Sequence, residues 1–62
     1  MKLNYYNAKT DDRKSILIPN ANIEKAIIDN CILAYGNGFY VLNQIDEWTY
    51  KLNDDITCTL WP

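Results

Sequence analysis

Residues 48–61 read WTYKLNDDITCTLW and predict an antiparallel β-hairpin. Apolar or aromatic residues occupy every second position on both sides of residues 53–55, an Asn-Asp-Asp triplet that favours a tight turn. One face of the hairpin is then apolar. A shift by one residue would mix the two faces, so we expect a fixed register. With a three-residue loop, the facing pairs are Leu52 and Ile56, Tyr50 and Cys58, and Trp48 and Leu60.

A second hairpin is predicted immediately upstream. Its strands are Ile32–Tyr35 and Phe39–Leu42, and Gly36-Asn37-Gly38 lies between them. Glycine and asparagine supply the positive φ angles that tight hairpins need. A phosphate-binding loop is the alternative for this glycine-rich triplet. That alternative is weaker, because neither a lysine nor a helical pattern follows the triplet.

The N-terminal part of the chain is expected to hold two strands and the only helix. The helix is predicted over Ile23–Asn30, with Asn20 or Asn22 as its cap. So short a helix is unstable alone, so its apolar stripe is expected to pack on the sheet rather than on a partner. The two strands are predicted at Lys2–Tyr6 and Ser15–Ile18, joined by a polar loop over residues 7–14.

Together these elements predict a single α+β domain over residues 1–62. We expect a small antiparallel sheet of four to five strands, with two C-terminal hairpins and one short α-helix packed on one face. No apolar run approaches the ~20 residues of a membrane span. Because no signal-peptide pattern opens the chain, we expect a complete, reduced and cytoplasmic protein. Cys31 and Cys58 then pack as free thiols, with one disulfide as the alternative.

The residue types argue against an enzyme. The chain has no histidine and only one serine, Ser15, and no spacing places a base beside a nucleophile. The two cysteines alone cannot complete a four-ligand zinc site, so neither a metal nor a cofactor is expected. Adjacent carboxylates are interpreted as solvated turn residues, with a weak calcium contact as the alternative. These pairs are Asp11-Asp12, Asp46-Glu47 and Asp54-Asp55.

The aromatic residues are numerous for a core of this size. Five tyrosines, two tryptophans and one phenylalanine occur in 62 residues. We expect Phe39, Trp48 and Tyr50 on the helix-covered face of the sheet. Tyr6, Tyr40 and Trp61 are out of phase with their buried neighbours. They are therefore candidate partner-binding residues, and a secondary core at the sheet edges is the alternative.

Charge is distributed unevenly along the chain. Residues 1–25 carry five basic and three acidic side chains (+2), whereas residues 26–62 carry one basic and five acidic ones (−4). Nucleic acid is therefore an unlikely partner, since Lys51 alone accompanies the C-terminal rings. An acidic rim would instead steer the chain to a basic protein surface. The predicted rim consists of Asp46, Glu47, Asp54 and Asp55.

These observations favour a small, non-catalytic protein-binding module. Its asparagine- and isoleucine-rich composition is typical of AT-rich phage and mobile-element genes, which suggests a stoichiometric inhibitor or regulator, for example of a defence enzyme. One alternative is a homo-oligomer that binds a small molecule between its subunits. Another is a structural subunit that assembles through an exposed strand edge.

Overall fold

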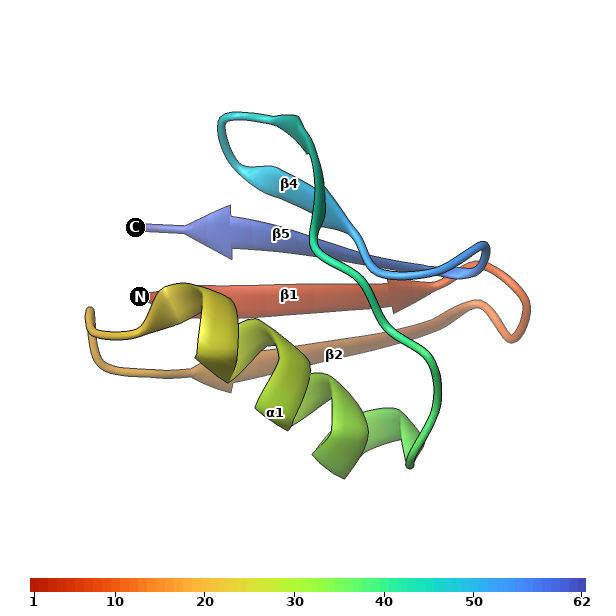
Figure 1. Ribbon diagram of the computed structural model, residues 1–62. Coiled ribbons are helices and arrows are strands. Elements are labelled where there is room, and N and C mark those ends of the chain that lie inside the picture. The colour runs from red at the N-terminus through yellow and green to blue at the C-terminus, as the bar shows by residue number, and fades with distance from the viewer.

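Five strands and one helix form the protein in a computed structural model that describes residues 1–62 (Figure 1). In chain order they are β1 (Lys2–Asn7), β2 (Asp12–Leu17), α1 (Ile23–Tyr35), β3 (Asn43–Asp46), β4 (Thr49–Lys51) and β5 (Ile56–Trp61). All strand pairs are antiparallel, which confirms the predicted α+β fold class. The C-terminal hairpins are β3–β4 and β4–β5, so the first of them differs from the one predicted.

The strand order is β2-β1-β5-β4-β3, so the two ends of the chain meet in the middle of the sheet. β1 and β5 pair along their whole length, from Lys2 opposite Trp61 to Asn7 opposite Ile56. The N- and C-termini consequently lie side by side (Figure 1). This order places side chains from the basic N-terminal half directly beside those from the acidic C-terminal half.

The β4–β5 hairpin has the predicted register. Tyr50 pairs with Cys58, and the Leu52 amide donates a hydrogen bond to the Ile56 carbonyl at 2.9 Å. The side-chain oxygen of Asn53 accepts hydrogen bonds from two backbone amides further along the turn. This Asx turn confirms that the Asn-Asp-Asp triplet at residues 53–55 forms a tight turn.

The helix is longer than predicted. α1 continues past Asn30 to Tyr35, so the predicted strand Ile32–Tyr35 is wrong. Ile27 and Cys31 are buried and lie four residues apart, and the partly buried Tyr35 continues the same spacing. The apolar residues at Ile32–Tyr35 therefore form the last turn of the helix and not a strand.

Both ends of α1 are formed by residues with positive φ. Asn22 precedes the helix with φ 50°, and its side chain makes no capping hydrogen bond. Gly36 follows the helix with φ 85°, and its amide donates to the Ile32 carbonyl at 2.8 Å. The glycine predicted for a hairpin turn therefore stops the helix.

Residues 36–42 form an irregular connection from α1 to β3. The predicted strand Phe39–Leu42 is wrong, because the segment joins the sheet through a single backbone hydrogen bond, from the Val41 amide to the Leu52 carbonyl at 2.9 Å. The strand of this region is β3, which sequence reasoning missed. All four of its residues are exposed, and a bulge interrupts its pairing with β4, so no apolar alternation marks it.

β2 begins earlier than predicted, at Asp12 within the expected loop. The register carries the β1–β2 pairing to Asn7 opposite Asp12. The side-chain oxygen of Asn7 accepts a hydrogen bond from the Lys9 amide at 3.0 Å, and Asp11 adopts φ 55°. The connecting turn is therefore tight rather than a long loop.

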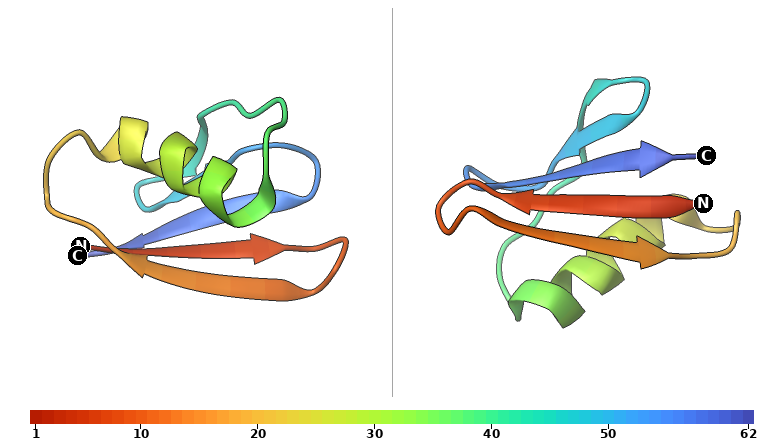
Figure 2. Two further views of the ribbon diagram at one scale, coloured as in Figure 1. Left: turned by 90° about the horizontal axis from the view of Figure 1, so that it is seen from below. Right: turned by 180° about the vertical axis from the view of Figure 1, so that it is seen from behind.

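α1 crosses one face of the sheet and forms the core with it (Figure 2). Its first turn lies near Tyr50 of β4, and its last turn brings the ring of Tyr35 within 5.7 Å of the Lys14 amine on β2. The Tyr5 hydroxyl donates to the Ile27 carbonyl at 2.6 Å and ties β1 to the helix. The buried residues are Leu3, Tyr5, Ile27, Cys31, Leu52, Ile56, Cys58 and Leu60.

Both cysteines are free and fully buried. Burial is the main cause that raises the pKa of both thiols, to about 12 for Cys58. The structure therefore agrees with packed thiols rather than a disulfide. The single helix is too short and not apolar enough to cross a membrane.

Candidate functional site

One face of the sheet has neither helix nor loop in front of it (Figure 2). Along β1, Leu3 and Tyr5 are buried on the helix side, so the residues between them point to the other side. The register extends this alternation to β2, β5 and β4. We call the uncovered side the open face, and it carries Lys2, Asn4, Tyr6, Arg13, Ser15, Leu17, Thr49, Lys51, Thr57, Thr59 and Trp61.

Two of the three aromatic residues predicted to bind a partner lie on the open face. Trp61 is 62% exposed and pairs with Lys2. Tyr6 lies further along β1, about 13 Å from that pair at ~3.3 Å per residue. The Arg13 guanidinium lies over the Tyr6 ring, 4.6 Å from its centroid. The Tyr6 hydroxyl donates to the Asp11 carboxylate at 3.1 Å, which fixes the ring.

A shallow hollow of about 420 Å³ lies between the two rings. Asn4, Ser15 and Thr59 form its polar floor. The Ser15 hydroxyl donates to the side-chain oxygen of Asn4 at 2.7 Å, whereas the side-chain nitrogen of Asn4 is shielded from solvent without a partner. The open face therefore has polar groups at its centre and rings at its two ends.

The structure does not bring Tyr40 to this face. Tyr40 lies in the connection after α1, and its hydroxyl donates to the Gly36 carbonyl at 2.7 Å. Its ring packs against the core, and burial together with the nearby Cys31 raises the pKa of the hydroxyl. Tyr40 therefore has a structural contact that explains its position.

The four acidic residues predicted as one rim are separated. Asp46 and Glu47 lie where β3 turns into β4, and Asp54 and Asp55 lie in the turn at the other end of β4. Asp46 accepts a hydrogen bond from the Trp48 amide at 2.9 Å, as expected of a turn residue. The geometry therefore gives two small acidic turns, not a continuous rim.

The strand order changes the charge around the aromatic rings. Lys2, from the N-terminal half, pairs with Trp61 of the C-terminal half, and Arg13 pairs with Tyr6 within the N-terminal half. Lys51 lies on the same face, opposite Thr57. In the sequence, Lys51 is the only basic residue of the C-terminal half. In the folded sheet, three basic residues, Lys2, Arg13 and Lys51, share the open face with Trp61.

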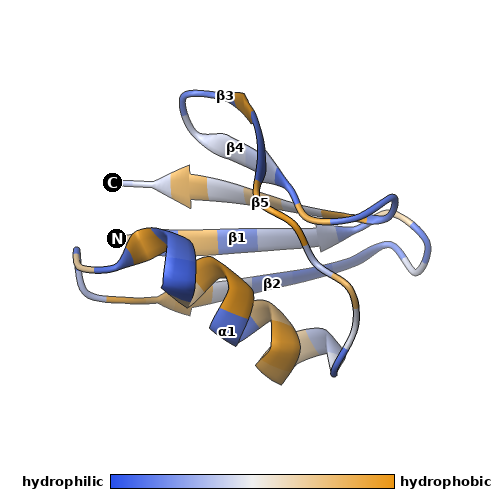
Figure 3. Cartoon of the chain, viewed as in Figure 1, coloured by the Kyte–Doolittle hydropathy of each residue, from blue (hydrophilic) through white to orange (hydrophobic).

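A second surface was missed by sequence reasoning. Large apolar side chains are exposed at intervals from the second half of α1 to the start of β4. Figure 3 shows the corresponding orange segments in α1, in the connection and at β3, with blue and pale segments between them. Residues 30–45 contain no charged side chain, a signal that the sequence offered. Phe39 and Trp48, expected under the helix, are 85% and 43% exposed. We call this the apolar surface, and its residues are Leu33, Phe39, Val41, Ile45 and Trp48.

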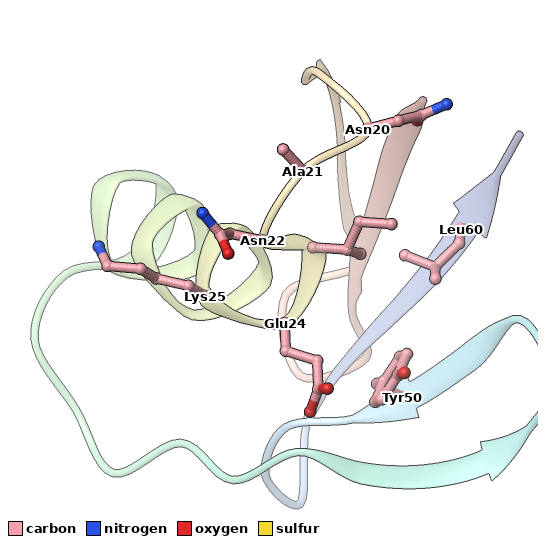
Figure 4. A pocket seen from close by; sticks show the side chains of 8 residues that line it. Asn20, Ala21, Asn22, Glu24, Lys25, Tyr50 and Leu60 are labelled. Carbon is pink, nitrogen blue, oxygen red and sulfur yellow. The ribbon is translucent and has the colours of Figure 1, made fainter.

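A further hollow lies between the first turn of α1 and strands β4 and β5 (Figure 4). Glu24 and Lys25 contribute from the helix, while Tyr50 and Leu60 contribute from the sheet. Glu24 points towards Tyr50, and Lys25 is engaged elsewhere, in a 2.7 Å ion pair with Asp29. This hollow is open and mixed in polarity, and nothing in it converges on a ligand.

Both free edges of the sheet carry features that oppose pairing with another strand. The outer edge, β2, holds the consecutive charged residues Asp12, Arg13 and Lys14. The opposite edge, β3, is short and bulged. Charges, short length and bulges are the usual means by which sheets prevent edge-to-edge assembly.

No group of three or more metal-ligating side chains comes together in the structure. Comparison with protein-family models, with curated proteins and with solved structures found no match to this chain. The open face and the apolar surface are therefore the two candidate functional sites of the protein.

Proposed function

We propose that the protein is a non-catalytic binding module that docks on another protein through the apolar surface and acts as a stoichiometric inhibitor or regulator. The observation that carries this proposal is the exposure of five large apolar side chains on a stretch almost free of charge. Single exposed apolar side chains are normal, but several of them along one stretch favour an interaction site.

The composition of the apolar surface supports a protein partner. Charged residues are depleted and aromatic residues enriched at the centres of protein interfaces. Phe39 and Trp48 supply the aromatic rings, and residues 30–45 supply no charge that binding would have to desolvate. Burying a large apolar side chain contributes about 1.5–3 kcal/mol, so the five side chains together offset an association cost of about 4–15 kcal/mol.

The shape of the apolar surface favours a different protein over a second copy. Leu33 and Phe39 keep 81% and 85% of their surface exposed, so they protrude. A symmetric dimer would need matching recesses on the same patch. The two hollows of this chain lie elsewhere and are bordered by polar or charged groups. The partner would therefore supply an apolar groove.

Leu33 and Leu17 provide a matched pair of variants for the test. They are 81% and 80% exposed, and they lie on the apolar surface and the open face respectively. Neither contributes to the core, so Leu33→Asp and Leu17→Asp should both fold. In tagged capture from bacterial lysate, the wild type and Leu17→Asp should retain one protein in near-equal amount, and Leu33→Asp should lose it.

Equal retention by all three proteins would contradict the proposal. Light scattering on the purified protein distinguishes self-association, which would appear as a dimer that Leu33→Asp dissociates. The proposal includes action in the cytoplasm, the compartment in which unpaired thiols such as Cys31 and Cys58 persist. An anti-defence role remains part of the same proposal and depends on the identity of the captured protein.

A further inference from the structure

We propose that the open face binds a single strand of nucleic acid. The open face and the apolar surface are different sides of the protein, so this proposal can be tested independently of the protein-binding proposal. The two surfaces differ in charge. The apolar surface lacks charge, whereas the open face carries Lys2, Arg13 and Lys51.

Aromatic rings and cations alternate on this face in a way that suits a polyanion with flat bases. Lys2 lies beside Trp61, and Arg13 lies over Tyr6 at 4.6 Å. Bases stack on an exposed ring such as Trp61 irrespective of sequence, and they also stack on a guanidinium plane such as that of Arg13, which covers the Tyr6 ring. Lysine side chains on the same face contact the phosphates. The backbone positions of Trp61 and Tyr6 are four residues apart along the sheet, about 13 Å, which leaves room for intervening nucleotides.

The centre of the open face supplies hydrogen bonds. Asn4, Ser15 and Thr59 form the floor of the hollow between the rings. The side-chain nitrogen of Asn4 has no partner in the protein but is enclosed by its neighbours, so the hydroxyls of Ser15 and Thr59 are the groups of this floor that face a base edge or a phosphate oxygen. Hydroxyl and amide groups are common contacts to sugar, phosphate and bases.

The arrangement favours a nucleic acid over an acidic protein. A protein interface has an apolar core surrounded by a polar rim. The open face has the opposite order, with polar groups in the middle and the rings of Tyr6 and Trp61 at the ends. A duplex is also disfavoured, since its stacked bases present no free faces to the rings.

Acidic residues near the face limit the expected affinity. Asp11 pairs with Arg13 at 3.3 Å, and Asp46 lies at the end of β3. The net charge of the chain is −2. We therefore expect weak, salt-sensitive binding. If Lys2, Arg13 and Lys51 each contact one phosphate, a plot of the logarithm of the binding constant against the logarithm of salt concentration should have a slope of about −2.

The two tryptophans of the chain make a matched test, because Trp61 lies on the open face and Trp48 on the apolar surface. Fluorescence anisotropy with a labelled oligothymidylate of about 12 nucleotides at low salt should report binding by the wild type. Trp61→Ala should weaken it about ten-fold, and Trp48→Ala should leave it unchanged. Lys2→Ala should weaken binding, and Lys25→Ala, on the exposed side of α1, should not.

Quenching gives a second measurement that needs no alanine variant. In Trp48→Phe the only tryptophan is Trp61, and oligothymidylate should quench its fluorescence, whereas Trp61→Phe should show no quenching. The proposal is overturned if oligothymidylate does not bind at low salt, or if the two alanine variants weaken binding equally. Polyglutamate binding as tightly as oligothymidylate would also overturn it, in favour of an acidic protein partner.

Discussion

The rings of Tyr5 and Tyr35 pack edge to face, with centroids 6.3 Å apart and planes at 72°, but only the Tyr5 hydroxyl has a hydrogen-bond partner. Tyr5 donates to the Ile27 carbonyl at 2.6 Å and joins β1 to α1. The Tyr35 hydroxyl is buried and unpaired. Its burial, and then the nearby Asp12 carboxylate, raise its pKa to about 12.

Removing the two hydroxyl groups should have opposite consequences. Tyr5→Phe loses a buried hydrogen bond and should lower the free energy of unfolding by about 1–2 kcal/mol. Tyr35→Phe removes a buried group that has no partner, so it should be neutral or stabilising. Urea unfolding of both variants measures the difference. Equal losses in the two variants would contradict these hydrogen-bond assignments.

Stability should fall at alkaline pH. The pKa of Cys58 is raised from 9.0 to about 12, mainly by burial, so the folded state favours the neutral thiol. Its contribution is complete below pH 9.0 and is lost as the pH rises towards 12. The raised pKa of Tyr35 and Tyr5 adds to the loss above pH 10.0. Chemical unfolding at increasing pH should show this decline.

Cys58→Ala is the control for the alkaline effect. The variant lacks the thiol, so its stability should fall less steeply between pH 9 and 12, although its value at neutral pH is lower by about 1 kcal/mol for the lost packing. If the wild type and the variant decline in parallel, the thiol does not contribute and the tyrosines account for the loss.

The burial of both thiols should also be visible chemically. Cys31 and Cys58 are fully buried, and burial raises the pKa of each, so few thiolates form and reagents cannot reach them. Reaction with a disulfide reagent at neutral pH should be slow in the folded protein and rapid in denaturant. A thiol that reacts at once under native conditions would show that the core is open.

Gly36 should tolerate substitution poorly. Its φ of 85° lies outside the conformations that residues with a Cβ adopt readily. Gly36→Ala should therefore destabilise the protein by about 1–3 kcal/mol, measured by thermal or urea unfolding. Gly38→Ala is the comparison, because Gly38 has no positive φ and a Cβ there would meet only the Tyr40 side chain, at 3.1 Å from its hydroxyl, so a shift of that ring is the one cost. Similar losses in both variants would contradict the conformational argument.

The sequence predicted those elements whose local pattern and tertiary role agree. Strict alternation around residues 53–55 specified the β4–β5 hairpin and its register. The apolar stripe of the helix predicted over Ile23–Asn30 specified the start of α1. The sequence predicted a strand where the helix ends, because Ile32–Tyr35 is apolar enough for a strand. Gly36, which follows, is compatible with either a hairpin turn or the end of a helix.

Other features depend on contacts that the sequence does not display. β3 has no apolar alternation and exists only because β4 is available to pair with it. The sequence separates a basic N-terminal half from an acidic C-terminal half, but β1 lies between β2 and β5, so Lys2 is placed beside Trp61. The alternation of side chains along a strand correctly predicted that Tyr6 and Trp61 point away from the helix. Tyr40 lies in an irregular connection, where no such alternation exists.

Photo-crosslinking tests the docking surface most directly. A benzophenone amino acid in place of Phe39, which is 85% exposed, should capture the partner with little change in shape. The same analogue at Leu17 is the control on the open face. The account predicts one protein adduct from position 39, heavier than two copies of the chain, and no protein adduct from position 17. Protein adducts from position 17 alone, or only a crosslinked pair of this chain from position 39, would contradict it.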